Sequence, residues 1–313
     1  AFATFSELVP SPSYLVCAMT AVVVFLPQHT FINSMVGDGV LAELMVCLVL
    51  FCWARLFRRG LNAWLVFGLA LGTLGGLWSK TTATFLIPLN TMLALWWFFR
   101  QPRRAWTWRK IGFLVSGFAF LAIAMWLWGR LWPPSDSNTL SRLWEPLLTG
   151  NVLWEDMRGI TFGQALLLSY DSFWAYFGWM AIPVSDRWYG AIVLATLGAA
   201  VGWGFWSRDR ATGRGERHDF ALWAAIMMGG TFLLAVSIFV WAALLSRATG
   251  HYQFQGRYLF PVIVPFAFLL VGGWVNITPS RTRRFLVWAG LVFLIMFDAW
   301  AVIRYLVPYY FSG

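Results

Sequence analysis

One short polar segment, set between two long apolar runs, holds the residues best suited to chemistry. Residues 27–43 read PQHTFINSMVGDGVLAE and contain two amides, one imidazole and two carboxylates, from Gln28, His29, Asn33, Asp38 and Glu43. Ionisable groups among membrane helices are costly and are usually retained for function. We therefore expect this polar segment to lie at the mouth of a helical bundle and to contribute to a functional site.

Asp38 is the residue of this segment that we predict to be catalytic. Asp38 and Glu43 are five residues apart, which on a helix displaces them by about 140°. Because the two side chains then do not share a face, a paired-carboxylate mechanism is disfavoured. Asp38 is left as a lone acid that could orient a hydroxyl, an amine or a metal ion. The alternative is that Asp38 only caps the helix that follows.

A lysine interrupts the next apolar stretch. The sequence SKTT, residues 79–82, breaks the apolar run between residues 61 and 99. Flanked by hydroxyls, Lys80 could neutralise a phosphate as a point charge. The alternative is a surface lysine that extends its ammonium to the outer interface and binds no ligand.

The segment HYQFQGRYLFP, residues 251–261, leads directly into another apolar run. Arg257 at the start of a helix would add a bidentate donor to the free backbone N–H groups there, which favours phosphate binding. The alternative is a belt of Arg and Tyr that only anchors the chain at the membrane interface.

Together these segments predict a cationic, hydroxyl-rich outer pocket beside one acid, which suits a phosphate-bearing lipid that enters from the bilayer. The candidate binding residues are Gln28, His29, Lys80, His251, Gln255, Arg257 and Tyr258. No Ser-His-Asp, HExxH, Walker or GxGxxG pattern is present. The apolar runs also lack the repeated charges expected of a proton relay or an ion pathway.

The composition indicates a membrane protein. The chain is 60% hydrophobic and only 12% charged, whereas soluble domains carry about 25% charged residues. Although the net charge is +10, the basic residues lie in short clusters between apolar runs, which argues against nucleic acid. Cys17, Cys47 and Cys52 fall inside apolar runs without metal-ligand spacing, so we interpret them as small buried hydrophobes.

Nine apolar runs predict an all-α polytopic membrane protein, because about 20 residues cross a bilayer as a helix. The runs cover residues 14–27, 39–57, 61–78, 82–99, 111–128, 188–206, 220–245, 258–277 and 285–307. We divide the chain into N-terminal membrane helices with the outer polar segment (1–129), an external loop with an interfacial aromatic segment (130–187) and C-terminal membrane helices (188–313).

Clusters of arginine and lysine give the orientation. Four clusters fall on one side if the helices alternate in direction, and the positive-inside rule makes that side cytoplasmic. They are Arg55, Arg58 and Arg59; Arg100, Arg103, Arg104, Arg109 and Lys110; Arg208, Arg210, Arg214 and Arg217; and Arg281, Arg283 and Arg284. We interpret residues 162–183 as an amphipathic segment on the outer interface, because a tenth span there would place the third cluster outside.

Four segments carry a resemblance to a known family: PQHTFINSMVGDGVLAE, GLALGTLGGLWSKTTATFLIPL, SFWAYFGWMAIPV and YQFQGRYLFPVIVP. In the same order, they resemble segments of bacterial polytopic membrane glycosyltransferases with the GT-C fold, and of a related family of uncharacterised bacterial membrane proteins. The resemblance implies transfer of a sugar from a polyprenyl-phosphate donor to a lipid, glycan or protein acceptor. The transfer would take place on the outer face of the bacterial inner membrane.

The same resemblance implies roles for individual residues. Asp38 takes the place of the acid in the family's Asn-Asp motif, and Gly37 stands where the family has the asparagine. Lys80 matches the lysine of its Thr-Lys pair, and Arg257 and Tyr258 match its Gly-Arg-Tyr motif. A divalent metal is compatible with this scheme, and the expected partners are membrane lipid and the polyprenyl-phosphate-linked sugar.

Two further interpretations stay open. Members of the family usually begin with a helix and an external loop that carries the catalytic base. Here only AFATFSELVPSPS precedes the first apolar run, and Glu7 falls on the predicted cytoplasmic side. We therefore expect either that upstream helices are missing from this sequence or that the chain is a degenerate accessory or structural subunit of a larger membrane complex. A transporter is the third interpretation, since the break at residues 79–82 resembles a broken-helix site.

Overall fold

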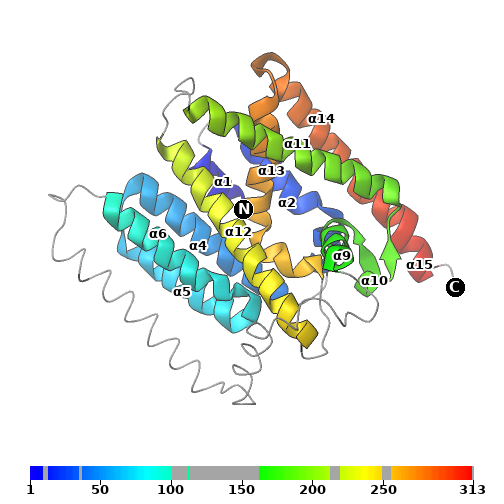
Figure 1. The fold of residues 1–313 in the computed structure, drawn as a ribbon, viewed down its shortest axis with the longest axis horizontal. Coiled ribbons are helices and arrows are strands. Elements are labelled where there is room, and N and C mark those ends of the chain that lie inside the picture. Colours follow the sequence, from blue (N-terminus) through cyan, green and yellow to red (C-terminus); the bar gives the residue numbers. More distant parts are fainter. Residues whose placement is uncertain are drawn as a thin grey trace.

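A computed structural model describes residues 1–9, 13–34, 37–100, 112, 162–211, 219–248 and 255–311 of the chain, which are almost wholly helical (Figure 1). The predicted span 111–128, apart from residue 112, and residues 130–161 of the predicted external segment 130–187 lie outside these residues.

The α-helices are α1 (Phe2–Leu8), α2 (Ser13–Phe25), α3 (Pro27–Asn33), α4 (Asp38–Arg59), α5 (Ala63–Ser79), α6 (Leu86–Arg100), α9 (Phe162–Trp174), α10 (Phe177–Met180), α11 (Asp186–Ala211), α12 (Asp219–Ala248), α13 (Ile263–Ile277), α14 (Ser280–Ala301) and α15 (Val307–Phe311). The shorter elements are the 3-10 helices η1 (Thr81–Phe85) and η3 (Gly256–Val262), the π-helical turn η4 (Val302–Leu306) and the strand β1 (Ile182–Pro183).

Five helical segments of the described residues are long and apolar enough to cross a membrane. They are Gly39–Arg59, Asp186–Arg210, Phe220–Val240, Gly256–Ile277 and Ser280–Phe311. The number becomes six if α2 and α3, which are bent by 62° relative to each other, form one broken span. An all-α membrane protein is therefore supported, but the predicted count of nine spans is not confirmed.

Two of the predicted spans are shorter in the structure than the sequence suggested. Helix α5 has 17 residues, which rise about 26 Å and fall short of a hydrocarbon core of about 30 Å. The run predicted over residues 82–99 is divided between η1 and α6, and its apolar helical part covers Ala83–Phe99. Both are apolar helices, but each is shorter than any of the five candidate spans.

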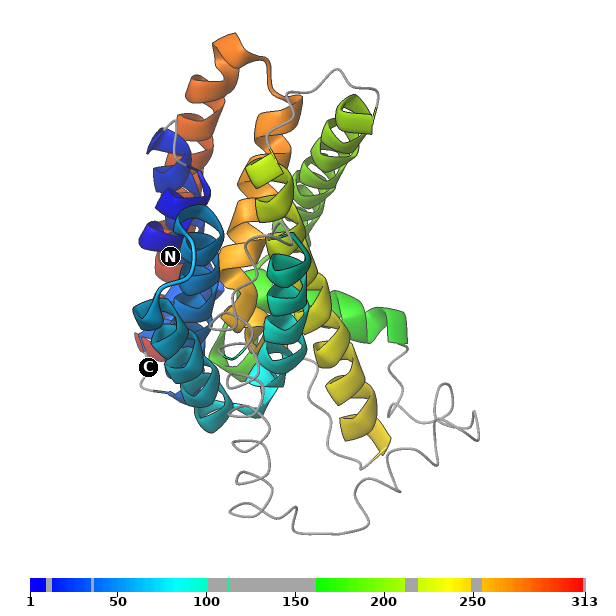
Figure 2. The same ribbon diagram turned by 90° about the vertical axis from the view of Figure 1, so that its left-hand side faces the viewer.

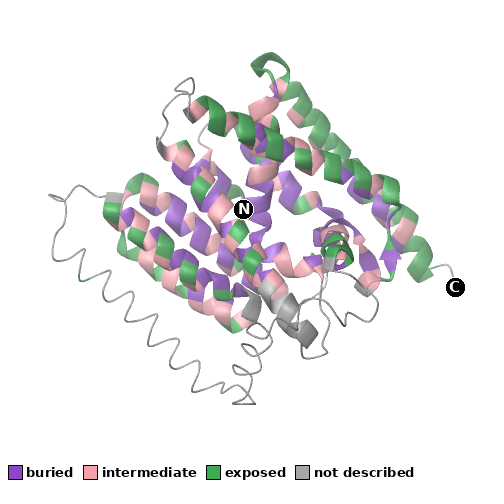
Figure 3. Ribbon diagram, in the orientation of Figure 1, coloured by how far each residue is buried: buried purple, intermediate pink, exposed green. Residues whose placement is uncertain are grey.

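Apolar side chains cover the outer faces of the bundle. Trp64 and Phe285 are 79% and 73% exposed, and in Figure 3 the outer surfaces of α11 and α14 are largely exposed while buried residues concentrate in α4 and α13. Soluble monomers rarely expose apolar surface over such a continuous area. Contact with lipid explains this distribution.

The two ends of the bundle differ in charge. In Figure 2 the C-terminal ends of α4 and α11 and the N-terminal ends of α12 and α14 lie at the upper end of the bundle. The described arginines of three predicted clusters belong to these helix ends: Arg55, Arg58, Arg59, Arg208, Arg210, Arg281, Arg283 and Arg284. The side of the membrane that this end faces stays a prediction. Arg103, Arg104, Arg109, Lys110, Arg214 and Arg217 lie outside the described residues.

A buried carboxylate ties the first basic cluster to helix α1. Glu7 is 6% exposed and forms ion pairs with Arg59 at 2.8 Å, Arg58 at 3.3 Å and Arg55 at 3.8 Å. Burial of a carboxylate requires such partners, because an unpaired charge is strongly destabilising in an apolar environment. Glu7 thus lies at the basic end of α4, on the side where the sequence placed it.

Glycines bring two helix pairs into close contact. A Cβ atom added to Gly202 of α11 would meet the backbone of Gly273 in α13, and one added to Gly273 would meet the backbone of Ala199. Between α4 and α5, a Cβ atom on Gly72 would lie 3.0 Å from the backbone oxygen of Met45. Small residues let membrane helices approach closely and pack firmly. These contacts fix α11 against α13 and α4 against α5 at short distance.

Candidate functional site

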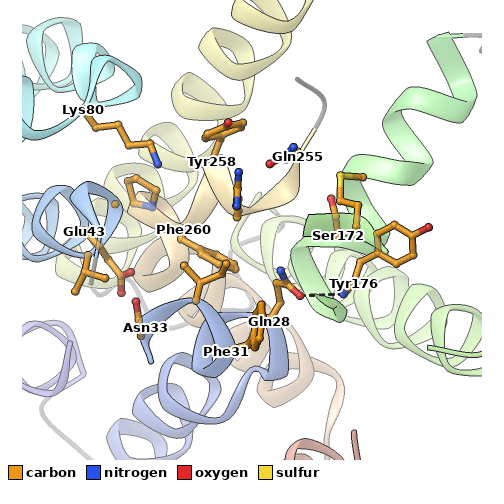
Figure 4. Close-up of a pocket in the computed structure, with 17 residues that line it drawn as sticks. Gln28, Phe31, Asn33, Glu43, Lys80, Ser172, Tyr176, Gln255, Tyr258 and Phe260 are labelled. Carbon is orange, nitrogen blue, oxygen red and sulfur yellow. Dashed lines mark hydrogen bonds between the residues drawn. The ribbon is translucent and has the colours of Figure 1, made fainter. Parts of the chain in front are cut away.

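A pocket of about 340 Å³ (Figure 4) lies at the N-terminal end of α4, opposite the end of that helix that carries Arg55, Arg58 and Arg59. It is enclosed by α3, the first turns of α4, the end of α5, η3 and the segment that contains α9 and α10. Its lining residues are Gln28, Phe31, Ile32, Asn33, Gly37, Gly39, Val40, Glu43, Lys80, Ser172, Tyr176, Met180, Gln255, Arg257, Tyr258, Phe260 and Pro261. Four segments that are distant in the sequence therefore meet at one place.

The polar segment reaches the pocket through a bend in the chain. Pro27 occupies the first turn of α3, where its missing N–H costs nothing and its fixed φ favours a new helix. The resulting 62° bend between α2 and α3 directs Gln28 and Asn33 of α3 into the pocket. The sequence predicted a polar mouth here but not that residues 27–33 would be helical.

Helix α4 begins at Asp38, and its N-cap is Gly37. Asp38 therefore occupies the first helical position, one residue later than the capping interpretation placed it. Gly37 and Gly39, its two neighbours in the chain, both line the pocket. The backbone of Asp38 is thus at the pocket, and its catalytic role stays a prediction.

Lys80 ends helix α5 and reaches across to α4. Its backbone is extended, with φ −158° and ψ 133°, so the helix stops at Ser79. The Lys80 Nζ atom lies 4.9 Å from the centre of the Tyr258 ring, and a Cβ atom on Gly39 would lie 3.3 Å from it. The neighbouring hydroxyl does not face the pocket, because Ser79 Oγ donates to the Gly75 carbonyl oxygen at 2.5 Å. The expectation of hydroxyls around Lys80 is therefore wrong for Ser79.

Gly256 fixes the position of the Arg257–Tyr258 pair. Its N–H donates to Ser172 Oγ at 2.7 Å, and a Cβ atom on Gly256 would collide with the backbone of Ser169 and Phe173 in α9. Only glycine fits so close to another backbone. Arg257 follows in the first turn of η3, and its Cζ atom lies 5.5 Å from the centre of the Tyr258 ring. The Tyr258 ring is thus in contact with both cations of the pocket.

A histidine–glutamate pair forms part of the wall, and the sequence analysis assigned Glu43 no role. His29 Nε2 lies 2.8 and 2.9 Å from the two carboxylate oxygens of Glu43, and both side chains are buried. Glu43 lines the pocket, whereas His29 stands behind it with its ring edge against Phe260. His29 therefore acts on the pocket through Glu43 and does not itself line it. The sequence contains an indication of this pair, because a histidine and a glutamate that are buried in apolar surroundings each need a polar partner.

Gln28 links the polar segment to the aromatic segment. Its Oε1 atom accepts a hydrogen bond from the Tyr176 N–H at 2.9 Å, drawn as a dashed line in Figure 4. Ser172, Tyr176 and Met180 of the aromatic segment complete this side of the pocket. The sequence predicted that residues 162–183 lie on the outer interface. It did not predict that three of them line the pocket.

The structure brings together most of the predicted binding residues. Gln28, Lys80, Gln255, Arg257 and Tyr258 all line the pocket. His251 lies outside the described residues. Among the residues that the structure describes, no group of three or more His, Cys, Asp or Glu side chains could hold a metal ion. The binding roles of these residues stay predictions, and their convergence is the observation on which a function can be argued.

Asp171, beside the pocket wall on α9, gives a pH-dependent prediction. Burial raises its pKa to about 6 from 3.8, and the nearby negative charge of Asp186 adds to the effect. Because the folded-state pKa is raised, its stabilising contribution is present below the unfolded pKa and is lost as the pH rises through about 6. We expect Asp171→Asn to raise the melting temperature at pH 7.5 and to change it much less at pH 4.5. An equal gain at both pH values would contradict the prediction, and Asp186→Asn should give a smaller gain.

No model of a known protein family, no curated protein and no solved structure matches the chain. A function for the protein is therefore argued from the pocket and its residues.

Proposed function

We propose that the protein is a membrane glycosyltransferase that uses a polyprenyl-phosphate-linked sugar as donor and transfers the sugar to a lipid, glycan or protein acceptor. The observation that carries this proposal is the convergence of Lys80 and Arg257 on the Tyr258 ring in one pocket. These two cations come from opposite halves of the chain and meet at the end of an apolar bundle.

The two cations suit a phosphate group. An ammonium acts as a point charge, and a guanidinium can donate two parallel hydrogen bonds to phosphate oxygens. The aromatic ring between them adds apolar surface, and Phe31, Phe260 and Pro261 do the same on the remaining wall. A charged head group with a long hydrocarbon tail fits a cationic pocket at the end of membrane helices better than a freely soluble phosphate does.

The pocket supports a reaction in which phosphate is the leaving group. The acceptor hydroxyl oxygen forms a bond to the anomeric carbon, and the bond between that carbon and the phosphate oxygen breaks. Polyprenyl phosphate departs with the electron pair, and a general base takes the hydroxyl proton. Lys80 and Arg257 stabilise the negative charge that develops on the leaving phosphate, which is commonly the largest catalytic contribution. Asp38, at the start of α4, orients the acceptor.

The proposed location follows from the charge of the two ends. If the arginine-rich end is cytoplasmic by the positive-inside rule, the pocket opens on the outer face of the bacterial inner membrane. Sugar transfer then takes place on the periplasmic side, where a polyprenyl carrier can deliver the sugar without a soluble nucleotide donor.

Binding and turnover of polyprenyl ligands test this proposal. The protein, reconstituted in liposomes, is mixed with undecaprenyl phosphate, with undecaprenol, or with radiolabelled undecaprenyl-phosphate glucose. We expect saturable binding of the phosphate and not of the alcohol, together with release of labelled sugar. Equal binding of the alcohol would contradict the proposal. Binding without any sugar release would favour an accessory subunit instead.

A further inference from the structure

Gln28 presents a hydrogen-bond donor to the pocket. Its side chain is 96% buried, since only 4% is exposed. The Tyr176 N–H can only donate, so the amide oxygen of Gln28 must face it. The amide nitrogen then points into the pocket (Figure 4), where it has no hydrogen-bond partner among the described side chains and backbone. A buried amide donor needs an acceptor, and a ligand oxygen in the pocket supplies one.

Glu43 presents an acceptor to the same pocket. An ionised carboxylate has about four lone-pair positions and no donor. His29 Nε2 occupies positions on both oxygens, and the remaining ones are available to the pocket that Glu43 lines. Asn33 Nδ2 lies 2.8 Å from His29 Nε2 and 3.3 Å from His29 Nδ1, so the imidazole contacts a side-chain amide as well as the carboxylate. Glu43 is therefore an oriented acceptor, fixed by a histidine that is itself buried.

The donor and the acceptor face the pocket from two sides of Phe260. In Figure 4, Gln28 lies to the right of Phe260 and Glu43 to its left, near Asn33, while Lys80 and Tyr258 lie above them. A sugar hydroxyl both donates and accepts hydrogen bonds, so different hydroxyls of one sugar suit the Gln28 donor and the Glu43 acceptor. Aromatic walls with a few oriented polar groups are typical of small-molecule sites.

We propose that Gln28 and Glu43 form a sugar subsite that binds the hydroxyls of the donor's glycosyl group while Lys80 and Arg257 bind its phosphate. This inference rests on the proposed function and adds the class of sugar. Because Glu43 is a carboxylate, the subsite favours a sugar without an acidic group and disfavours a uronic acid by like-charge repulsion.

The first experiment compares two ligands on the reconstituted protein: undecaprenyl phosphate and undecaprenyl-phosphate glucose. We expect the wild type to bind the glucosyl ligand at least about tenfold more tightly, the scale of one hydrogen bond to a charged group. In Gln28→Met and Glu43→Gln the ratio of the two affinities should fall to within about twofold. Equal losses for both ligands, or no loss for either, would overturn the sugar subsite.

A second experiment needs no variant and so does not depend on whether the variants fold. The wild type is titrated with monodeoxy-glucosyl ligands and with the glucuronosyl ligand. At least one deoxy ligand should bind about tenfold more weakly, and so should the glucuronosyl ligand. Binding of all deoxy ligands within about twofold of the parent would overturn the inference. Wild-type binding of undecaprenyl phosphate no better than undecaprenol would instead remove the proposed function, and the sugar subsite with it.

Discussion

The double variant Lys80→Gln/Arg257→Gln is expected to lose phosphate-dependent ligand binding by roughly 10²–10⁴-fold. Each cation contributes charge-assisted hydrogen bonds to phosphate worth about 1.5–3 kcal/mol. Both cations contact the ring of Tyr258, so their effects should be coupled and the two single variants should not add simply. Titration of undecaprenyl phosphate against the wild type, both single variants and the double variant measures this coupling.

A matched control removes the same charge from the other end of the bundle. Arg281 and Arg284 are exposed in the first turns of α14, and the variant Arg281→Gln/Arg284→Gln lowers the net charge by the same amount. We expect this variant to bind undecaprenyl phosphate like the wild type. Equal loss in both double variants would show that binding depends on overall charge and not on the pocket.

The variant Gly256→Ala is expected to separate η3 from α9 and to disrupt the pocket without touching a charged residue. The added methyl group would meet backbone atoms of Ser169 and Phe173, which cannot move aside as a flexible side chain can. Overpacking of this kind costs about 1–3 kcal/mol. The hydrogen bond from the Gly256 N–H to Ser172 Oγ is lost in the same movement, so Arg257 is displaced and ligand affinity should fall at least about tenfold.

Hydrogen–deuterium exchange over residues 162–180 and the melting temperature measure this effect. Gly290→Ala is the control, because nothing lies within 4 Å of the added Cβ atom and alanine in a helix interior is favoured over glycine by up to about 1 kcal/mol. We expect faster exchange and a lower melting temperature for Gly256→Ala, and an unchanged or higher melting temperature for Gly290→Ala. Unchanged exchange over α9 in Gly256→Ala would contradict the close contact.

The helical class and the segments that meet at the pocket could be predicted because polar residues stand out in an apolar chain. Lys80 interrupts a long apolar run and Arg257 immediately precedes one, and in a membrane such residues are retained where they have a partner or a function. If successive runs cross the membrane in opposite directions, Lys80 and Arg257 fall at the same end of the bundle. Two residues so distant in the sequence could therefore be assigned to one pocket.

The finer geometry could not be predicted for two physical reasons. The bond between Gln28 and the Tyr176 N–H joins residues that are 148 positions apart, and no local pattern encodes such a contact. The pairing of His29 with Glu43 depends on the bend at Pro27, whose size is set by packing and not by the proline alone. The spacing of Asp38 and Glu43 along α4 says nothing about His29, because His29 lies on another helix. The role of Glu43 therefore does not follow from that spacing.

The short helix α1 shows a related limit. Seven residues are too few to form a stable helix by their own propensity, so no helix was expected here from local preference. The ion pairs of Glu7 with the arginines of α4 and the burial of Phe5 supply the missing stabilisation. Tertiary contacts, and not local preference, make this segment helical.

The glycine contacts restrict how a long-chain ligand could travel. Between Gly202 and Gly273 the backbones of α11 and α13 touch, so a hydrocarbon tail has no passage there. At Gly72, Val49 and Met45 fill the seam between α4 and α5 in the same way. Any lipid that reaches the pocket sideways from the bilayer must therefore enter elsewhere than between α11 and α13 or between α4 and α5 at these glycines.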